Sequence, residues 1–219
     1  MPTTLTLLVC AMLLGVLLGV VAGALAALRQ GTWVDRTLNV IISTIYGMPV
    51  FWIGLMLIIL FALKLRWLPS DGYVSPLGDL REGVRSLVLP AGVLGLALGV
   101  VISRFVRASL LDTLSEDYMR TARSKGLSRG QALRRHALRN ALVPAITVIG
   151  MQFGELLGGA VVIETVFSIP GMGQLMLTAI GQRDYPTLQA SLLILMALFA
   201  VINLITDLSY RWIDPRVGV

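Results

Sequence analysis

The 219-residue sequence has few charged residues, only 14% of the total. Soluble domains usually contain about 25% charged and about 45–50% apolar residues, whereas 56% of this chain is hydrophobic and its mean hydropathy is +0.83. This balance excludes an ordinary water-soluble enzyme, and the apolar content also excludes a disordered chain. The composition therefore predicts one all-α domain, residues 1–219, that crosses a membrane several times.

Residues that carry catalytic or metal chemistry are also scarce. The chain has one cysteine, Cys10, and one histidine, so it has no Cys/His cluster that could hold zinc. The phosphate-binding pattern G-x-x-x-x-G-K-[ST] is missing, so this chain binds no ATP through a P-loop. We therefore predict no catalytic residue, no metal site and no cofactor on this chain.

Five stretches with almost no charge are long enough, or nearly so, to cross a bilayer, which takes about 20 apolar residues. The third stretch, which begins at Ser86, extends to Leu111 if its arginines reach the lipid headgroups. The sequence thus predicts a polytopic helical bundle of about five transmembrane helices, with kinks at Pro49 and Pro90. The five stretches are Leu5–Leu28, Thr37–Leu63, Ser86–Ser103, Asn140–Ile163 and Tyr185–Thr206.

The distribution of positive charge predicts the topology. Half of the 18 Lys and Arg residues lie between Arg104 and Arg139, and the positive-inside rule places that segment in the cytoplasm. The net charge of +6 thus reflects topology, not nucleic-acid binding. Five spans then put the N-terminus outside and the C-terminus in the cytoplasm. An external start without a preceding span suggests that an upstream helix is missing from this sequence.

Glycines recur at a spacing of four in three spans. Such ridges let helix backbones approach closely where lipid provides no hydrophobic drive, so we expect helix packing along each of them. The ridges are Gly15, Gly19 and Gly23; Gly95 and Gly99; and Gly150, Gly154 and Gly158.

The basic segment 112–139 is predicted to hold two short helices joined by a tight turn. Acidic residues after Ser115 favour a helix start, and Gly126 after basic residues favours a helix stop. Ser128 with Gln131 three residues later is a capping box that begins the second helix. Such a protrusion suits a groove on a soluble partner, or it only holds the topology and contacts anionic lipid; the residues alone favour neither.

The amino-acid sequence of this segment resembles that of a known protein family. Y-x-R-T-A-R-x-K-G-L, followed by H-A-L-R-N-A-x-x-P, resembles the coupling segment of ABC-importer permeases, most closely their dipeptide/oligopeptide/nickel branch, although only Ala122 and Gly126 fit the generic E-A-A-x-x-x-G form. Glu164 to Gly173 is similar to the branch's E-x-x-F-x-x-P-G-x-G. The resemblance implies an ATPase-coupling role for Tyr118, Arg120, Thr121, Ala122, Arg123, Lys125, Gly126 and Leu127.

The resemblance covers almost the whole chain and is closest to the B-type membrane subunit, which normally has one more N-terminal helix and an external segment. It implies an ABC type I importer permease fold and the import of peptides or nickel. It also implies a location in the bacterial cytoplasmic (inner) membrane, as a multi-pass protein. Besides membrane lipid, it implies three kinds of partner: a second homologous permease, two ATP-binding subunits that hold ATP and Mg²⁺, and an extracytoplasmic substrate-binding protein.

Glu155 has the highest free-energy cost of membrane insertion in the predicted bundle, because this acidic residue lies near the middle of a span. Intramembrane acids usually face a cavity or a partner, so Glu155 either lines the translocation path or forms a hydrogen bond inside the bundle. Two other functions remain open. A proton-coupled secondary transporter would use Glu155 as proton carrier, and a membrane scaffold would recruit a partner without any flux.

Overall fold

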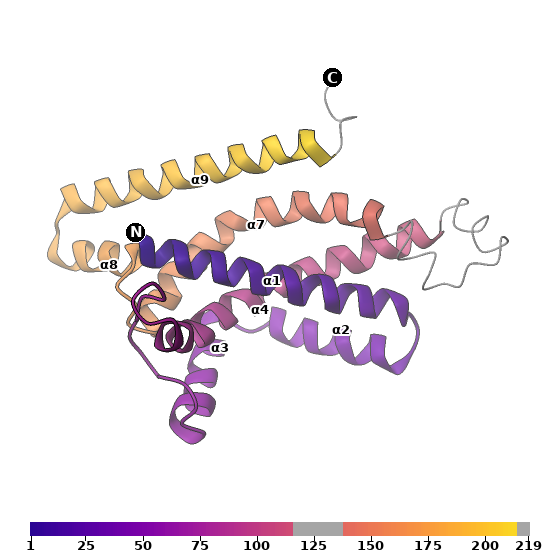
Figure 1. Cartoon of the computed structure of the whole chain (residues 1–219), viewed down its shortest axis with the longest axis horizontal. Coiled ribbons are helices and arrows are strands. Elements are labelled where there is room, and N and C mark those ends of the chain that lie inside the picture. The colour runs from indigo at the N-terminus through magenta and orange to yellow at the C-terminus, as the bar shows by residue number, and fades with distance from the viewer. Residues whose placement is uncertain (116–137, 214–219) are drawn as a thin grey trace.

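A computed structural model describes residues 1–115 and 138–213 (Figure 1). Helices and the loops that connect them make up these residues. The chain order is α1 (Pro2–Leu28), α2 (Trp33–Tyr46), α3 (Val50–Leu57), the π-helix η1 (Ile58–Lys64), α4 (Leu80–Ser115), α7 (Leu138–Val166), α8 (Met172–Gln182) and α9 (Tyr185–Ile213).

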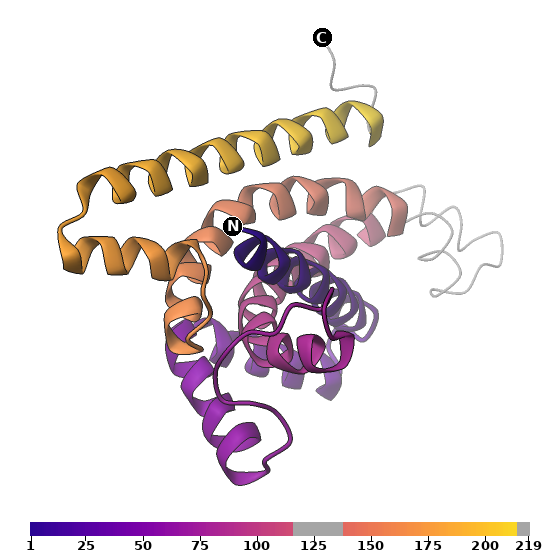
Figure 2. The same cartoon turned by 60° about the vertical axis from the view of Figure 1, so that its left-hand side comes forward.

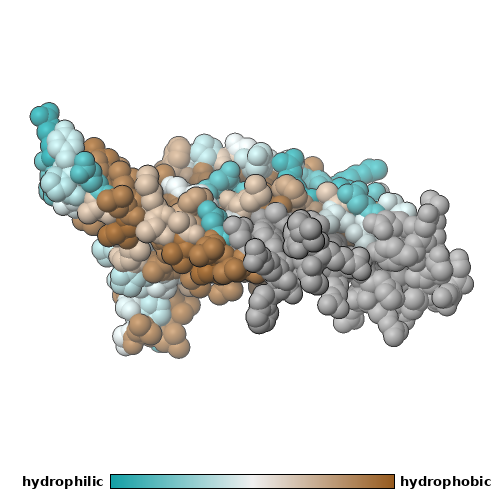
Figure 3. All heavy atoms as spheres, turned by 90° about the horizontal axis from the view of Figure 1, so that it is seen from above, coloured by the Kyte–Doolittle hydropathy of each residue, from teal (hydrophilic) through white to brown (hydrophobic). Residues whose placement is uncertain are grey.

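Four of these helices are long and apolar enough to cross a membrane: α1, α4, the part of α7 from Val148 to Val166, and the part of α9 from Tyr185 to Ile205. The helices α2 and α3–η1 together make a fifth candidate span. The predicted all-α bundle of about five spans is therefore confirmed. Large hydrophobic side chains are exposed over wide areas of the described surface (Figure 3), which is typical of a chain that contacts lipid or partner helices.

The second predicted span, Thr37–Leu63, has the predicted kink at Pro49, and the kink is sharp. Its two halves are bent by 104° relative to each other, and α3 leaves the bundle sideways (Figure 2). The break falls at Pro49, which has a φ of −60° and a ψ of 137° and precedes the first residue of α3. Proline has no N–H to donate and disfavours a helical conformation of the residue before it, here Met48. By contrast, Pro90 lies inside the continuous helix α4.

Helices α1 and α4 form the centre of the bundle, and two of the predicted glycine ridges face each other there. A Cβ at Gly15 would lie 2.8 Å from Leu98, and one at Gly23 would lie 2.5 Å from the carbonyl oxygen of Ser103. From the opposite side, a Cβ at Gly99 would lie 3.2 Å from the carbonyl oxygen of Gly15. The backbones thus approach as closely as glycine permits, which confirms the predicted packing of these two helices.

The third predicted ridge is only partly correct. Gly154 faces the ring of Phe199 on α9, but nothing lies within 4 Å of a Cβ added at Gly158. The neighbouring Gly159 contacts Leu94 on α4 instead. Spacing shows which residues share a helix face, but it does not show which face another helix covers.

Helix α8 lies at the end of the bundle opposite the α1–α2 turn and leads into α9, which runs beside α7 (Figures 1 and 2). Helix α8 begins directly after Gly171, its N-cap residue. Asp184 caps α9: its carboxylate accepts hydrogen bonds from the hydroxyl and the backbone N–H of Thr187, at 2.6 and 3.1 Å. These bonds stabilise the charged form and lower the pKa of Asp184.

Candidate functional site

The residues predicted to couple to an ATPase, Tyr118, Arg120 to Arg123 and Lys125 to Leu127, lie outside the described residues. The structure describes where the chain enters and leaves this segment. Helix α4 continues to Ser115, and α7 begins at Leu138. The segment is thus flanked directly by two helices of the bundle, so any displacement of its ends acts on those helices.

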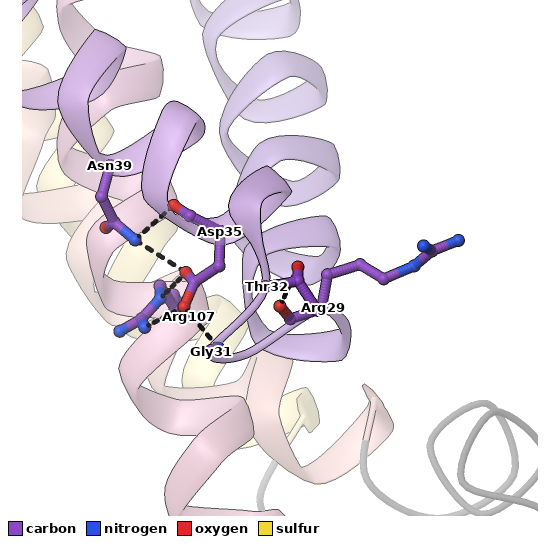
Figure 4. A network of polar contacts seen from close by, with 6 residues as sticks. All are labelled: Arg29, Gly31, Thr32, Asp35, Asn39 and Arg107. Carbon is purple, nitrogen blue, oxygen red and sulfur yellow. Dashed lines mark hydrogen bonds and ion pairs between the residues drawn. The ribbon is translucent and has the colours of Figure 1, made fainter.

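Near its C-terminal end, α4 is tied to the first turn of α2 by a bidentate ion pair between Arg107 and Asp35 (Figure 4). The Nε and Nη2 atoms of Arg107 each lie 3.0 Å from one oxygen of the Asp35 carboxylate. Asn39 donates a further hydrogen bond at 2.7 Å, and the backbone N–H of Gly31 another at 3.1 Å. The Asp35 side chain is 7% exposed and fully hydrogen-bonded, so the pair fixes the turn to α4 with a defined geometry.

The sequence predicts a topological role for Arg107, as one of the charges that hold the segment on one side of the membrane. Its ion pair with Asp35 was not predicted from the sequence, because the two residues lie 72 positions apart in the chain. The signal was an acid among the basic residues of the α1–α2 turn. Beside the pair, the Arg104 guanidinium lies 5.0 Å from the ring centre of Tyr46, a cation–π contact between α4 and α2.

Removing the Arg107 side chain is expected to destabilise the protein. In Arg107→Leu the buried Asp35 carboxylate keeps no cationic partner, and we expect a loss of about 2 kcal/mol, less than for a fully buried pair because Arg107 is 28% exposed. Thermal unfolding of the detergent-purified protein measures the change. The control is Arg85→Leu, whose ion pair with Glu82 is exposed at 41% and 47% and contributes about 1 kcal/mol or less. Equal effects of both substitutions would contradict a structural role for the Arg107 pair.

Glu155 lies in the middle of α7 and is exposed in this subunit. Its carboxylate accepts one hydrogen bond, at 2.9 Å, from the side-chain amide of Gln152 one turn earlier. Both residues line a pocket of about 100 Å³ between α3, α4 and α7, whose other walls are apolar and include Val50, Leu98 and Leu156. The structure thus places Glu155 on an open, mostly apolar pocket; Gln152 is the partner that sequence reasoning missed.

Glu164 forms the most enclosed polar network of the described residues. It is fully buried near the end of α7, and its carboxylate accepts hydrogen bonds from the Thr4 hydroxyl at 2.6 Å and from the backbone N–H of Gly173 at 2.7 Å, with a longer one of 3.4 Å from Gln174. The Thr4 oxygen in turn accepts the N–H of Met172 at 2.9 Å. Side chains from α1 and α7 thus satisfy the first N–H groups of α8, where a negative charge also stabilises the helix dipole.

Two glycines make room for this carboxylate. A Cβ at Gly171 would lie 2.0 Å from the Glu164 carboxyl group, and one at Gly173 would lie 2.5 Å from the Cα of Val161. Any larger residue would push α8 away from α7. The pattern E-x-x-F-x-x-P-G-x-G therefore has a structural basis in this chain: the acid caps the helix, and both glycines allow it to approach.

Solved structures identify the fold. A chain of the MetNI methionine ABC transporter, solved in inward-facing conformations, matches with a TM-score of 0.78, covering 97% of this chain and 93% of that one at 19% identity. A chain from the crystal structure of an amino acid ABC transporter with histidines matches with a TM-score of 0.61, covering 98% and 94% at 17% identity. This chain therefore shares its fold with a chain of each of these two ABC transporters.

The sequence comparison identifies the family. The model of the family described as the binding-protein-dependent transport system inner membrane component matches residues 15–219, and the chain belongs to this family. It is a multi-pass permease subunit of an ABC importer in the inner membrane, and the ATPase activity resides in partner subunits.

Curated relatives are similar over nearly the whole chain. A probable peptide ABC transporter permease protein of Sinorhizobium fredii is 46% identical, covering 98% of this chain and 68% of that protein. The di/tripeptide transport system permease protein DppB of Pseudomonas aeruginosa is 41% identical, covering 99% and 70%. The glutathione transport system permease protein GsiC of Escherichia coli is 42% identical, covering 98% and 67%. The chain thus spans about two thirds of the length of these relatives.

Proposed function

We propose that this permease subunit imports short peptides, driven by ATP hydrolysis on its partner subunits. The observation that carries the proposal is the similarity at 41–46% identity to permeases that are named for peptides, for di- and tripeptides and for glutathione, itself a modified tripeptide. None of these three names refers to nickel, so the proposal is restricted to peptides.

The transporter would contain a second homologous permease, two subunits that bind ATP and Mg²⁺, and an extracytoplasmic substrate-binding protein. In this proposal residues 1–219 act as one permease domain, and the chain itself holds no cofactor. The end of the bundle that carries the α1–α2 turn, with Arg29 and Arg36, also carries Arg104 and Arg107 near the end of α4. This shared location of positive charge supports a cytoplasmic position for that end and for the C-terminus, with the N-terminus and α8 outside.

Coupling would run through the segment 112–139, with Tyr118, Arg120 to Arg123 and Lys125 to Leu127 at the ATPase contact. We expect Gly126→Trp to abolish ATP-driven uptake, because the large ring would disturb both the predicted turn and the contact surface. Uptake of a radiolabelled tripeptide into proteoliposomes that hold the whole transporter measures the effect. The control is Gly78→Trp, because Gly78 is exposed in the connection before α4. Normal uptake by Gly126→Trp at normal membrane insertion would refute the coupling role.

A proton-coupled transporter is the second candidate, and the exposed carboxylate of Glu155 in the middle of α7 is the observation that favours it. The two mechanisms respond differently to inhibitors. ATP-driven import is expected to be blocked by vanadate and to survive a protonophore while ATP is present. Uptake that collapses with the proton gradient and ignores vanadate would support the second candidate instead.

A further inference from the structure

The position of Glu155 along α7 makes its charge costly unless a partner compensates it. Glu155 lies within the candidate membrane span of α7, which includes Val148 to Val166, and it is about 10 Å from Val148 and about 16 Å from Val166 at a rise of about 1.5 Å per residue. A carboxylate at this depth cannot remain in contact with lipid tails, so it faces a cavity or a cation.

The described part of the chain supplies no such cation. The ion pairs formed between described residues join Arg85 to Glu82 and Arg107 to Asp35, and Glu155 interacts with the neutral amide of Gln152. A carboxylate with one neutral donor retains acceptor capacity on both oxygens. A cation that binds Glu155 would therefore come from outside these residues.

The pocket beside Glu155 has the size and polarity for a small cationic group. Its volume is about 100 Å³; apolar side chains such as Val50, Leu94 and Leu98 line it, and its polar wall is formed by Glu155 and Gln152. Apolar walls lower the local dielectric constant and so strengthen the attraction between opposite charges. The Gln152 amide also offers a carbonyl oxygen, which can accept a second N–H from the same cation.

We propose that Glu155 and Gln152 form a subsite for the α-ammonium group of a peptide in transit. The inference rests on the proposed import of peptides and adds the group of the substrate that this pocket binds. The α-ammonium is the cation that every peptide with a free N-terminus carries, whatever its side chains. A single carboxylate aided by one amide binds it only weakly, as transport requires, because a ligand in transit has to leave again.

The test measures binding to the purified complex without the binding protein, so that only the membrane subunits select the ligand. Saturation-transfer NMR titrations compare trialanine with N-acetyl-trialanine, which lacks the charge. We expect the wild-type complex to bind trialanine about tenfold more tightly, the ratio expected for one charge-assisted contact. Glu155→Gln should remove this preference by weakening trialanine alone, and Glu155→Asp should retain part of it. The matched control is Glu82→Gln, an acid in the first turn of α4, which should leave the preference unchanged.

Any of three results would overturn the subsite. The wild-type complex would bind both peptides equally or bind neither, or Glu155→Gln would keep the preference, as a contact with a basic residue of the second permease predicts. A separate uptake measurement distinguishes this failure from failure of the proposed function. If the wild type imports trialanine with ATP but Glu155→Gln keeps the binding preference for trialanine over N-acetyl-trialanine, only the subsite is rejected. If the wild type imports no peptide at all, the proposed function is rejected too.

Discussion

Replacing Gly23 with leucine is expected to destabilise the protein by about 3 kcal/mol or more. The Cβ alone would lie 2.5 Å from the carbonyl oxygen of Ser103 and 2.9 Å from the Cβ of Val106. The first of these atoms belongs to the backbone of α4 and cannot rotate away, so α1 and α4 would have to move apart. Overpacking of a close interior typically costs about 1–3 kcal/mol, and here the displacement extends along the central helix pair.

The matched control for this prediction is Gly92→Leu. Gly92 lies on α4, and nothing lies within 4 Å of a Cβ added there, so both substitutions gain the same helix propensity, about 1 kcal/mol. Thermal unfolding of the two purified variants in the same detergent measures the difference. A Gly23→Leu protein as stable as Gly92→Leu would show that α1 and α4 are not packed as the structure describes.

Replacing Glu164 with methionine is expected to have a comparably large effect, about 3 kcal/mol. Methionine has a similar volume but accepts no strong hydrogen bond, so the Thr4 hydroxyl and the N–H of Gly173 lose their acceptor inside the protein. Each buried donor without a partner costs about 1–3 kcal/mol. Because these bonds hold the first turn of α8, we expect this helix to detach from α7 before the rest of the bundle unfolds.

Hydrogen–deuterium exchange of the α8 peptide and thermal unfolding together test this prediction. Glu155→Met is the control on the same helix, since Glu155 is exposed and bonded to one side chain, and its exchange in α8 should match the wild type. Unchanged protection of α8 in Glu164→Met would show that the carboxylate does not anchor this helix.

Much of the fold follows from the sequence because lipid imposes simple rules. Long uncharged stretches identify the spans, and the ridge of Gly15 and Gly19 identifies a face of close packing. The break at Pro49 bends the chain by 104°, more than a kink within one helix. A proline in the sequence predicts where a helix ends, but it does not predict the direction of the helix that follows. The pattern that includes Gly158 was read correctly as one face, but no described helix covers it.

The candidate site was predictable to different degrees. Glu155 stands out in the sequence because it is an acid in an apolar stretch, and Gln152, three residues earlier, lies on the same helix face. The contacts of Asp35 with Arg107 and of Glu164 with Thr4 span 72 and 160 positions. Such partners depend on how distant helices dock, which periodicity within one helix does not determine.

The most direct test of the proposed importer is to purify this chain from native membranes in mild detergent and identify what accompanies it by mass spectrometry. The result that we expect is a second, homologous permease and two ATP-binding subunits in comparable amounts, with ATPase activity that vanadate inhibits. A chain that purifies alone at native expression, without any ATP-binding subunit, would contradict it.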